Sequence, residues 1–211
     1  MSSNVCQGFI PKLKDNILGR LLNSDYDGDS YGEFTDEERN SVRIAGERIY
    51  RCKTLRINYT TYDVRRDANT INPTTHPDIM VKSPETGSDA QPFWYARVIG
   101  IFHGLVSSSH MGVEEKSLRR MDFLWVRWLG VEPGRYRHGF RNARLPKIGF
   151  IESTDAYAFN FIDPAQAIRG VHLIPAFSEG RTSALLPTAR SVARILNPEE
   201  KDDWVNFYVN M

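Results

Sequence analysis

Aromatic and β-branched residues gather in three short segments of this chain, and polar or turn-forming residues separate them. Each segment is bounded by Gly, Pro, Ser or charged side chains, which is typical of β-strands. The segments span residues 93–102, 122–129 and 168–174. Together they predict one small β-domain, and the alternation within the first segment favours an antiparallel sheet with one half-exposed face.

Helical spacing precedes these strands. Residues 11–23 begin with Pro11 and place leucines and one isoleucine at helical intervals, which predicts an amphipathic helix. Thr35 is followed three residues later by Glu38, and this pair predicts a capping box. We expect the second helix to run from Thr35 to about Arg48.

The remaining segments complete the expected architecture. Residues 49–66 alternate as in a strand, and residues 67–92 contain four prolines and a glycine, which predicts a long surface connection. Residues 187–197 have the spacing of one short C-terminal helix. The expected class is α+β, mainly β, with an SH3-like barrel between a helical extension and a C-terminal helix and tail. These three parts cover residues 1–50, 51–180 and 181–211.

Charge is distributed unevenly, although the net charge is only +1 and no field of the whole molecule favours nucleic acid. Residues 25–38 hold seven acids and no base, and residues 116–147 hold nine bases against two acids.

Cys6 and Cys52 are the only cysteines, which excludes a disulfide scaffold and favours a reducing compartment. Without a membrane-length apolar run or a signal peptide, we expect a soluble intracellular protein.

The basic segment predicts a loop that contacts phosphate. Arginine supplies forked donors that match phosphate, glycine allows close backbone approach, and Tyr136 and Phe140 offer surfaces on which bases stack. The predicted contacts are Arg135, Arg137, Arg141, Arg144 and Lys147. The alternative is a solvated loop whose arginines pair with the protein's own acidic segment.

The acidic segment imitates a calcium-binding loop. Counted from Asp27, oxygen ligands fall at loop positions 1, 3 and 12, which are Asp27, Asp29 and Glu38, and Gly32 falls at the sharp turn. Tyr31 at the fifth position is a poor ligand, and no second loop is present to pair with. We therefore expect an acidic turn that caps the second helix, and no metal site.

Four aromatic residues resemble the lining of a cage for a methylated lysine: Trp94, Tyr95, Trp125 and Trp128. The odd spacing between Trp125 and Trp128 places them on opposite faces of a strand, so packing is the favoured role for at least one.

None of the five histidines has metal-ligand spacing, and no nucleophile elbow, dinucleotide fingerprint or phosphate loop occurs. We expect neither an enzyme nor a cofactor.

Several long strings resemble the C-terminal part of proteins encoded by basidiomycete DNA transposons, or of genes derived from them. The strings are residues 11–15, 56–67, 123–130, 163–177 and 203–210, and the resemblance covers nearly the whole chain. In that family the catalytic transposase region lies upstream, so the resemblance implies a chain without the nuclease core.

Residues 93–177 are also similar to bromo-adjacent homology (BAH) domains, which are chromatin-binding β-barrels. The shared pattern is an aromatic-Ala-Arg-Val-Ile strand, a Val-x-Trp strand, and an Ile-x-Gly-x-His strand preceded by Asp-Pro. This likeness implies a nuclear accessory module and carries over no catalytic residue. The expected function is a non-catalytic module that binds DNA or chromatin. The alternative is a protein–protein interaction module that docks a transposase core or a peptide, and no membrane partner is expected.

Overall fold

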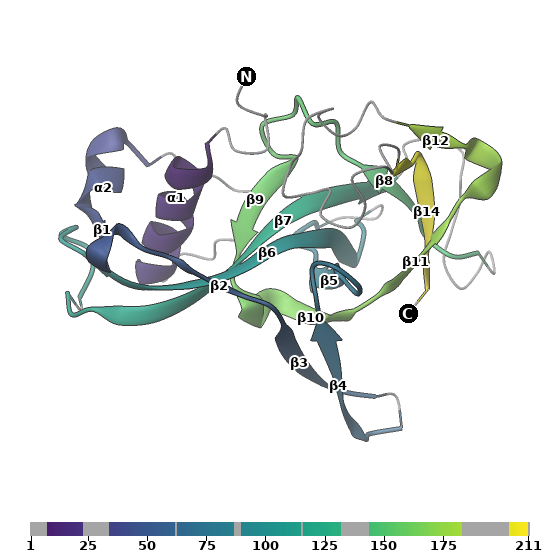
Figure 1. Ribbon diagram of the computed structural model, residues 1–211, viewed down its shortest axis with the longest axis horizontal. Helices are drawn as coiled ribbons and strands as arrows, with labels where there is room; N and C mark the ends of the chain where they lie inside the picture. The colour runs from purple at the N-terminus through teal and green to yellow at the C-terminus, as the bar shows by residue number, and fades with distance from the viewer. Residues whose placement is uncertain are drawn as a thin grey trace.

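The computed structural model describes residues 8–22, 34–61, 63–86, 90–114, 116–131, 144–182 and 203–210. This part of the chain is mainly β, which confirms the predicted class (Figure 1). Its helices are α1 (Phe9–Leu21), α2 (Asp36–Ser41) and three single turns of 3-10 helix at Ala45–Glu47, Pro164–Gln166 and Phe177–Glu179.

A long antiparallel hairpin forms the centre of a ten-stranded sheet. It consists of β6 (Phe93–Ser108) and β7 (Arg119–Val131), which extend two of the predicted strands. The free edge of β6 pairs with three short strands, β5 (Asp78–Lys82), β2 (Tyr50–Cys52) and β1 (Val42–Ile44). The free edge of β7 pairs with β9 (Phe159–Ile162) and β8 (Lys147–Phe150).

The main path through the sheet runs β10-β5-β6-β7-β8-β14-β11. Here β10 is Ala167–Gly170, β14 is Asn206–Asn210 and β11 is His172–Pro175. Only Val171 separates β10 from β11, so the two ends of the path are neighbours in the chain and the sheet curls. In the described residues no hydrogen-bonded ladder joins these ends, and no closed barrel forms.

The curled sheet encloses an apolar cluster whose buried members come from five strands of this path and from Val171, between β10 and β11. Its buried members are Met80, Tyr95, Leu129, Ile148, Phe150, Val171, Phe207 and Val209. A second cluster lies under α1, where Leu13, Ile17 and Leu18 are fully buried beside Phe123 and Trp125. Burial of this apolar face holds α1 on the sheet, as its helical spacing predicts.

Strand pairs join segments that the sequence analysis assigned to three different parts of the chain. β1 lies within the predicted helical extension and pairs with β6, and β14 lies within the predicted tail and pairs with both β8 and β11. The tail also contains β13 (Asp203–Trp204), which pairs with β12 (Arg181–Thr182). The predicted helix at residues 187–197 lies outside the described residues.

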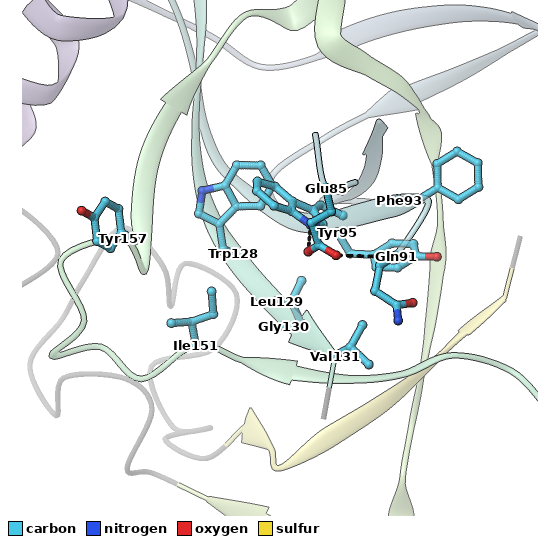
Figure 2. A pocket seen from close by; sticks show the side chains of 11 residues that line it. Glu85, Gln91, Phe93, Tyr95, Trp128, Leu129, Gly130, Val131, Ile151 and Tyr157 are labelled. Atoms are coloured by element: carbon cyan, nitrogen blue, oxygen red, sulfur yellow. Dashed lines mark hydrogen bonds between the residues drawn. The ribbon is translucent and has the colours of Figure 1, made fainter. Parts of the chain in front are cut away.

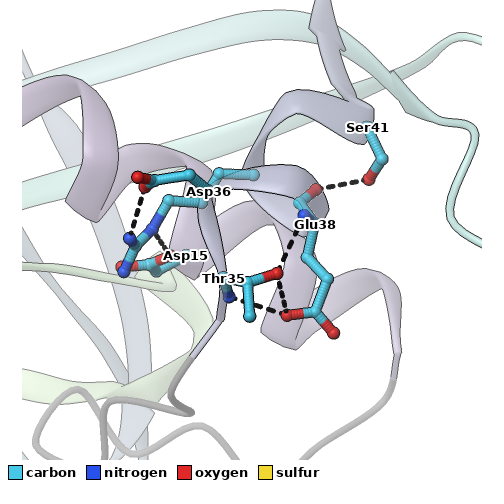
Figure 3. A network of polar contacts seen from close by, with 6 residues as sticks. Asp15, Thr35, Asp36, Glu38 and Ser41 are labelled. Atoms are coloured by element: carbon cyan, nitrogen blue, oxygen red, sulfur yellow. Dashed lines mark hydrogen bonds and ion pairs between the residues drawn. The ribbon is translucent and has the colours of Figure 1, made fainter.

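The second helix confirms the predicted cap but not the predicted length. The backbone N–H of Thr35 donates to Glu38 Oε2 at 2.7 Å, and the Glu38 N–H donates to Thr35 Oγ1 at 3.3 Å (Figure 3). Arg39 holds α2 on α1 through two hydrogen bonds to the buried Asp15, at 2.7 and 3.0 Å. The helix ends at Ser41, because the following residues enter the sheet as β1 beside Val106–Ser108.

The predicted surface connection at residues 67–92 is wrong over much of its length. It contains most of β4 (Arg66–Ile71) and all of β5. β4 pairs with β3 (Leu55–Thr60) in a separate two-stranded sheet. The prolines lie at the ends of these strands, where they terminate pairing without interrupting it.

Candidate functional site

The structure separates the predicted phosphate contacts. Arg135, Arg137 and Arg141 lie outside the described residues, and Arg144 is exposed. Lys147, in contrast, is buried at the start of β8, and its Nζ donates to Glu179 Oε1 at 2.6 Å. This placement weighs against a phosphate contact by Lys147 and assigns it to the packing of the sheet.

Glu179 accepts a second hydrogen bond, from Asn206 Nδ2 at 2.6 Å. The hydrogen bonds from Lys147 and Asn206 lower the pKa of the Glu179 carboxyl. The three side chains come from β8, β14 and the turn at Phe177–Glu179, so this cluster ties the C-terminal strand to the body of the sheet.

The described residues also contain a run of exposed bases, which the sequence analysis missed. We call it the basic strip, and it consists of Arg48, Arg51, Lys53, Arg56 and Arg66. All five are exposed, and no carboxylate of the described residues forms an ion pair with any of them. The signal was present in the sequence, because residues 48–66 hold six bases against Asp63 alone.

Two residues of the basic strip, Arg56 and Arg66, lie on the hairpin formed by β3 and β4. This hairpin projects from the lower edge of the molecule (Figure 1). Residues opposite one another on paired strands share a face. Arg56 is opposite Thr70, and Thr60 is opposite Arg66. With Asn58 between them, they form an exposed polar face that is slightly concave. We call this the outer face of the hairpin.

The inner face anchors the hairpin to the body. Ile57 and Ile71 are buried in an apolar cluster shared with the main sheet. The Gly170 N–H of β10 donates to Asn69 Oδ1 at 3.0 Å. A Cβ atom at Gly170 would lie 3.1 Å from Ile71 Cδ1, so glycine permits this close approach. The Arg169 guanidinium covers the Tyr59 ring at 4.9 Å. With the inner face occupied, only the outer face is available to a ligand.

The hairpin ends in a tight turn between Thr61 and Arg65. The Thr61 N–H donates to the Arg65 carbonyl at 2.8 Å, and Arg65 Nε contacts Asp63 Oδ2 at 2.9 Å. Val64 has a φ of 62° and is 81% exposed. A β-branched residue is strained in this left-handed region, and here it also exposes an apolar side chain to solvent.

A second candidate site is an aromatic pocket of about 290 Å³ between β6, β7 and the segment before β6 (Figure 2). Trp94 meets Trp128 edge to face at 5.7 Å, and its indole N–H donates to Glu85 Oε1 at 2.8 Å. The lining also includes Phe93, Tyr95 and Tyr157. Three of the four predicted cage residues therefore meet here, together with a carboxylate.

Trp125 is the exception among the predicted cage residues. It packs in the cluster under α1, with its ring centroid 4.6 Å from that of Phe161. Trp128 belongs to a different cluster, in agreement with the prediction that the two side chains point to opposite faces. Sequence spacing identified this separation, but it did not reveal that Glu85 and Tyr157 complete the pocket.

The described residues do not assemble a metal centre. No three His, Cys, Asp or Glu side chains among them lie close enough to hold an ion. Glu38, a predicted ligand position, is engaged with Thr35, whose hydrogen bonds lower its pKa. Asp27 and Asp29 lie outside the described residues.

One cysteine–histidine contact occurs on the sheet. Cys52 Sγ lies 3.3 Å from His103 Nδ1, and Tyr50 stacks on the same imidazole at 5.3 Å. Nucleophilic catalysis needs a third group that orients the base. In the described part of the chain, no carboxylate is bonded to the other ring nitrogen of His103. Among the described residues, the pair therefore lacks the third group of a catalytic triad.

Comparisons of the chain with protein-family models, curated proteins and solved structures found no match. The resemblances to transposon-encoded proteins and BAH domains therefore stay predictions. Within the described residues, no helix is long and apolar enough to cross a membrane.

Proposed function

We propose that this chain is a non-catalytic module that binds nucleic acid or chromatin, with the basic strip as its contact surface. The observation that carries the proposal is the presence of five exposed cations within residues 48–66, none of which pairs with a carboxylate of the described residues. Four of the five are arginines, whose planar donors match phosphate oxygens. A nuclear location, an origin from a transposon protein and an SH3-like or BAH-like barrel belong to the same proposal. The curled sheet supports the last of these.

Electrostatics sets the expected strength of this binding. Each phosphate contact releases condensed counterions, so five contacts give a slope of about −4.5 in a plot of log affinity against log salt concentration. A change from about 50 to 200 mM salt would then weaken binding by roughly 500-fold. Because the protein's net charge is only +1, such a steep salt dependence requires a surface on which positive charge is locally concentrated.

Fluorescence anisotropy with a labelled duplex of about 20 base pairs tests the proposal over this range of salt. The variant Arg51→Ala/Lys53→Ala should reduce the slope by about 1.8, because it removes two contacts. The control Lys82→Ala/Lys116→Ala also removes two exposed charges, but from β5 and the β6–β7 connection, and should bind as the wild type does. Absence of salt-dependent duplex binding by the wild type would refute the proposal.

The aromatic pocket supports a second candidate, a protein–protein interaction module. Its volume suits one side chain, and Glu85 adds a negative charge beside Trp94 and Trp128. Such a pocket favours an apolar or cationic residue of a docking peptide or of a transposase core. Titration with a trimethyl-lysine peptide, followed by tryptophan fluorescence, should give a saturable change that Glu85→Gln weakens. Identical titrations of the two proteins would remove the pocket from consideration.

A further inference from the structure

We infer that the β3–β4 hairpin is a two-stranded ribbon that enters the major groove of duplex DNA with its outer face toward the base edges. The inference rests on the proposed function and adds the element, the groove and the side chains that read it. It is based on the different surroundings of the inner and outer faces of the hairpin. The inner face is occupied by β10, whereas the outer face is solvated and polar.

The dimensions of the ribbon fit the groove. Each strand has six residues, which at about 3.4 Å per residue makes a ribbon roughly 20 Å long. The strands are about 4.8 Å apart, and the major groove, about 12 Å wide, admits a two-stranded ribbon with its side chains. At the end of the ribbon, the hydrogen bond from the Thr61 N–H to the Arg65 carbonyl holds the two strands together.

The chemistry of the outer face matches base edges better than a protein surface. Arg56 and Arg66 present the forked donors that bind guanine, and Asn58 presents the amide that pairs with adenine. Thr60 and Thr70 carry methyl groups that can contact thymine. Ala68 is the only purely apolar residue on this face, whereas protein interfaces have an apolar core.

Spacing along the ribbon is consistent with reading successive bases. Arg56 and Asn58 point to the same face and lie about 6.8 Å apart along the strand, which corresponds to two base-pair steps of about 3.4 Å. Arg48, Arg51 and Lys53 precede the hairpin, where they can meet the phosphates that flank the groove. With Arg56 and Arg66 on base edges, three phosphate contacts remain, and the salt slope becomes about −2.7 in place of the −4.5 that five phosphate contacts would give. Of the nearby acids, Asp63 pairs with Arg65. Asp67 keeps its charge, but it lies opposite Tyr59 on the other face of the ribbon, where it accepts from the Tyr59 hydroxyl at 3.0 Å.

A blocked major groove provides the test. The full chain is titrated with two duplexes of the same sequence, one unmodified and one whose cytosines carry bulky glucosyl groups in the major groove. We expect at least about tenfold weaker binding to the blocked duplex, equivalent to the loss of one good base contact. The variant Arg56→Ala/Arg66→Ala should bind both duplexes equally, and Lys82→Ala/Lys116→Ala should discriminate as the wild type does.

Selection from a pool of random duplexes then tests base reading directly. The wild type should enrich a short sequence motif, and Asn58→Ala, which changes no charge, should lose the preference at one position while keeping the salt slope. The five side chains changed in these variants are all exposed, so the thermal midpoints of the variants should equal that of the wild type.

The outcomes separate the inference from the proposed function. Equal, salt-dependent affinity for blocked and open duplexes would overturn the groove inference and leave phosphate binding intact. Stronger binding to single-stranded than to duplex DNA would also overturn it. A wild type without salt-dependent binding to any nucleic acid would refute both.

Discussion

The sequence predicts Lys147 as a phosphate contact, whereas the structure pairs it with Glu179. The substitution Lys147→Met tests which of these two roles the side chain has. Methionine keeps an unbranched apolar side chain in the buried site but removes the ammonium group. The structure predicts that this change lowers stability, because Glu179 loses one of its two hydrogen-bond donors. Duplex affinity should be unchanged when both proteins are folded.

The expected magnitude follows from the exposure of the two side chains. Lys147 is 11% exposed and Glu179 is 27% exposed, so the pair is intermediate between a surface and a buried ion pair. Surface pairs contribute about 0–1 kcal/mol, and breaking a buried pair costs about 3–5 kcal/mol. After allowance for solvent screening at Glu179, we expect a loss of about 1–3 kcal/mol. For a chain of this size, each kcal/mol lowers the thermal midpoint by about 2–4 °C.

Urea unfolding and duplex anisotropy, measured on the same preparations, make the distinction. In a double-mutant cycle with Glu179→Gln, the two effects on the free energy of unfolding should be coupled by about 1 kcal/mol or more. The reasoning would be wrong if Lys147→Met left stability unchanged and weakened duplex binding. That result would restore Lys147 as a phosphate contact.

Three further predictions concern stability. Arg39→Ala leaves Asp15, which is 1% exposed, without its bidentate partner, so urea unfolding should show a loss of about 3 kcal/mol that Asp15→Asn partly reverses; an unchanged midpoint would contradict it. Because hydrogen bonds lower the pKa of Glu179 in the folded state, its contribution to stability is present above the unfolded pKa and is lost as pH falls through the folded pKa. Urea titrations between about pH 6 and pH 3 should therefore show a shallower loss for Glu179→Gln than for the wild type, and parallel curves would contradict this. Val64→Asn should raise the free energy of unfolding by about 1 kcal/mol in calorimetry, since asparagine tolerates the left-handed conformation, and a lower midpoint would contradict the assigned strain.

Local sequence patterns determined the elements whose signals depend on near neighbours. The apolar spacing of residues 11–23 and the Thr35–Glu38 pair predicted α1 and the cap of α2, because both are formed within one or two helical turns. The aromatic and β-branched segments predicted β6, β7 and the β10–β11 region, since such residues fit a pleated, half-buried surface.

The tertiary structure alone decided which of these elements meet. Nothing local to residues 206–210 shows that they complete the sheet between β8 and β11, because strand pairing depends on partners that are distant in the chain. The same reason explains the site. Lys147 belongs by sequence to a basic segment, but in the fold it is buried and pairs with Glu179, which Asn206 also bonds. The separate charges of Arg56 and Arg66, in contrast, lie on one exposed face only when β3 pairs with β4. Sequence supplied the charges, and long-range pairing determined which of them remain available to a ligand.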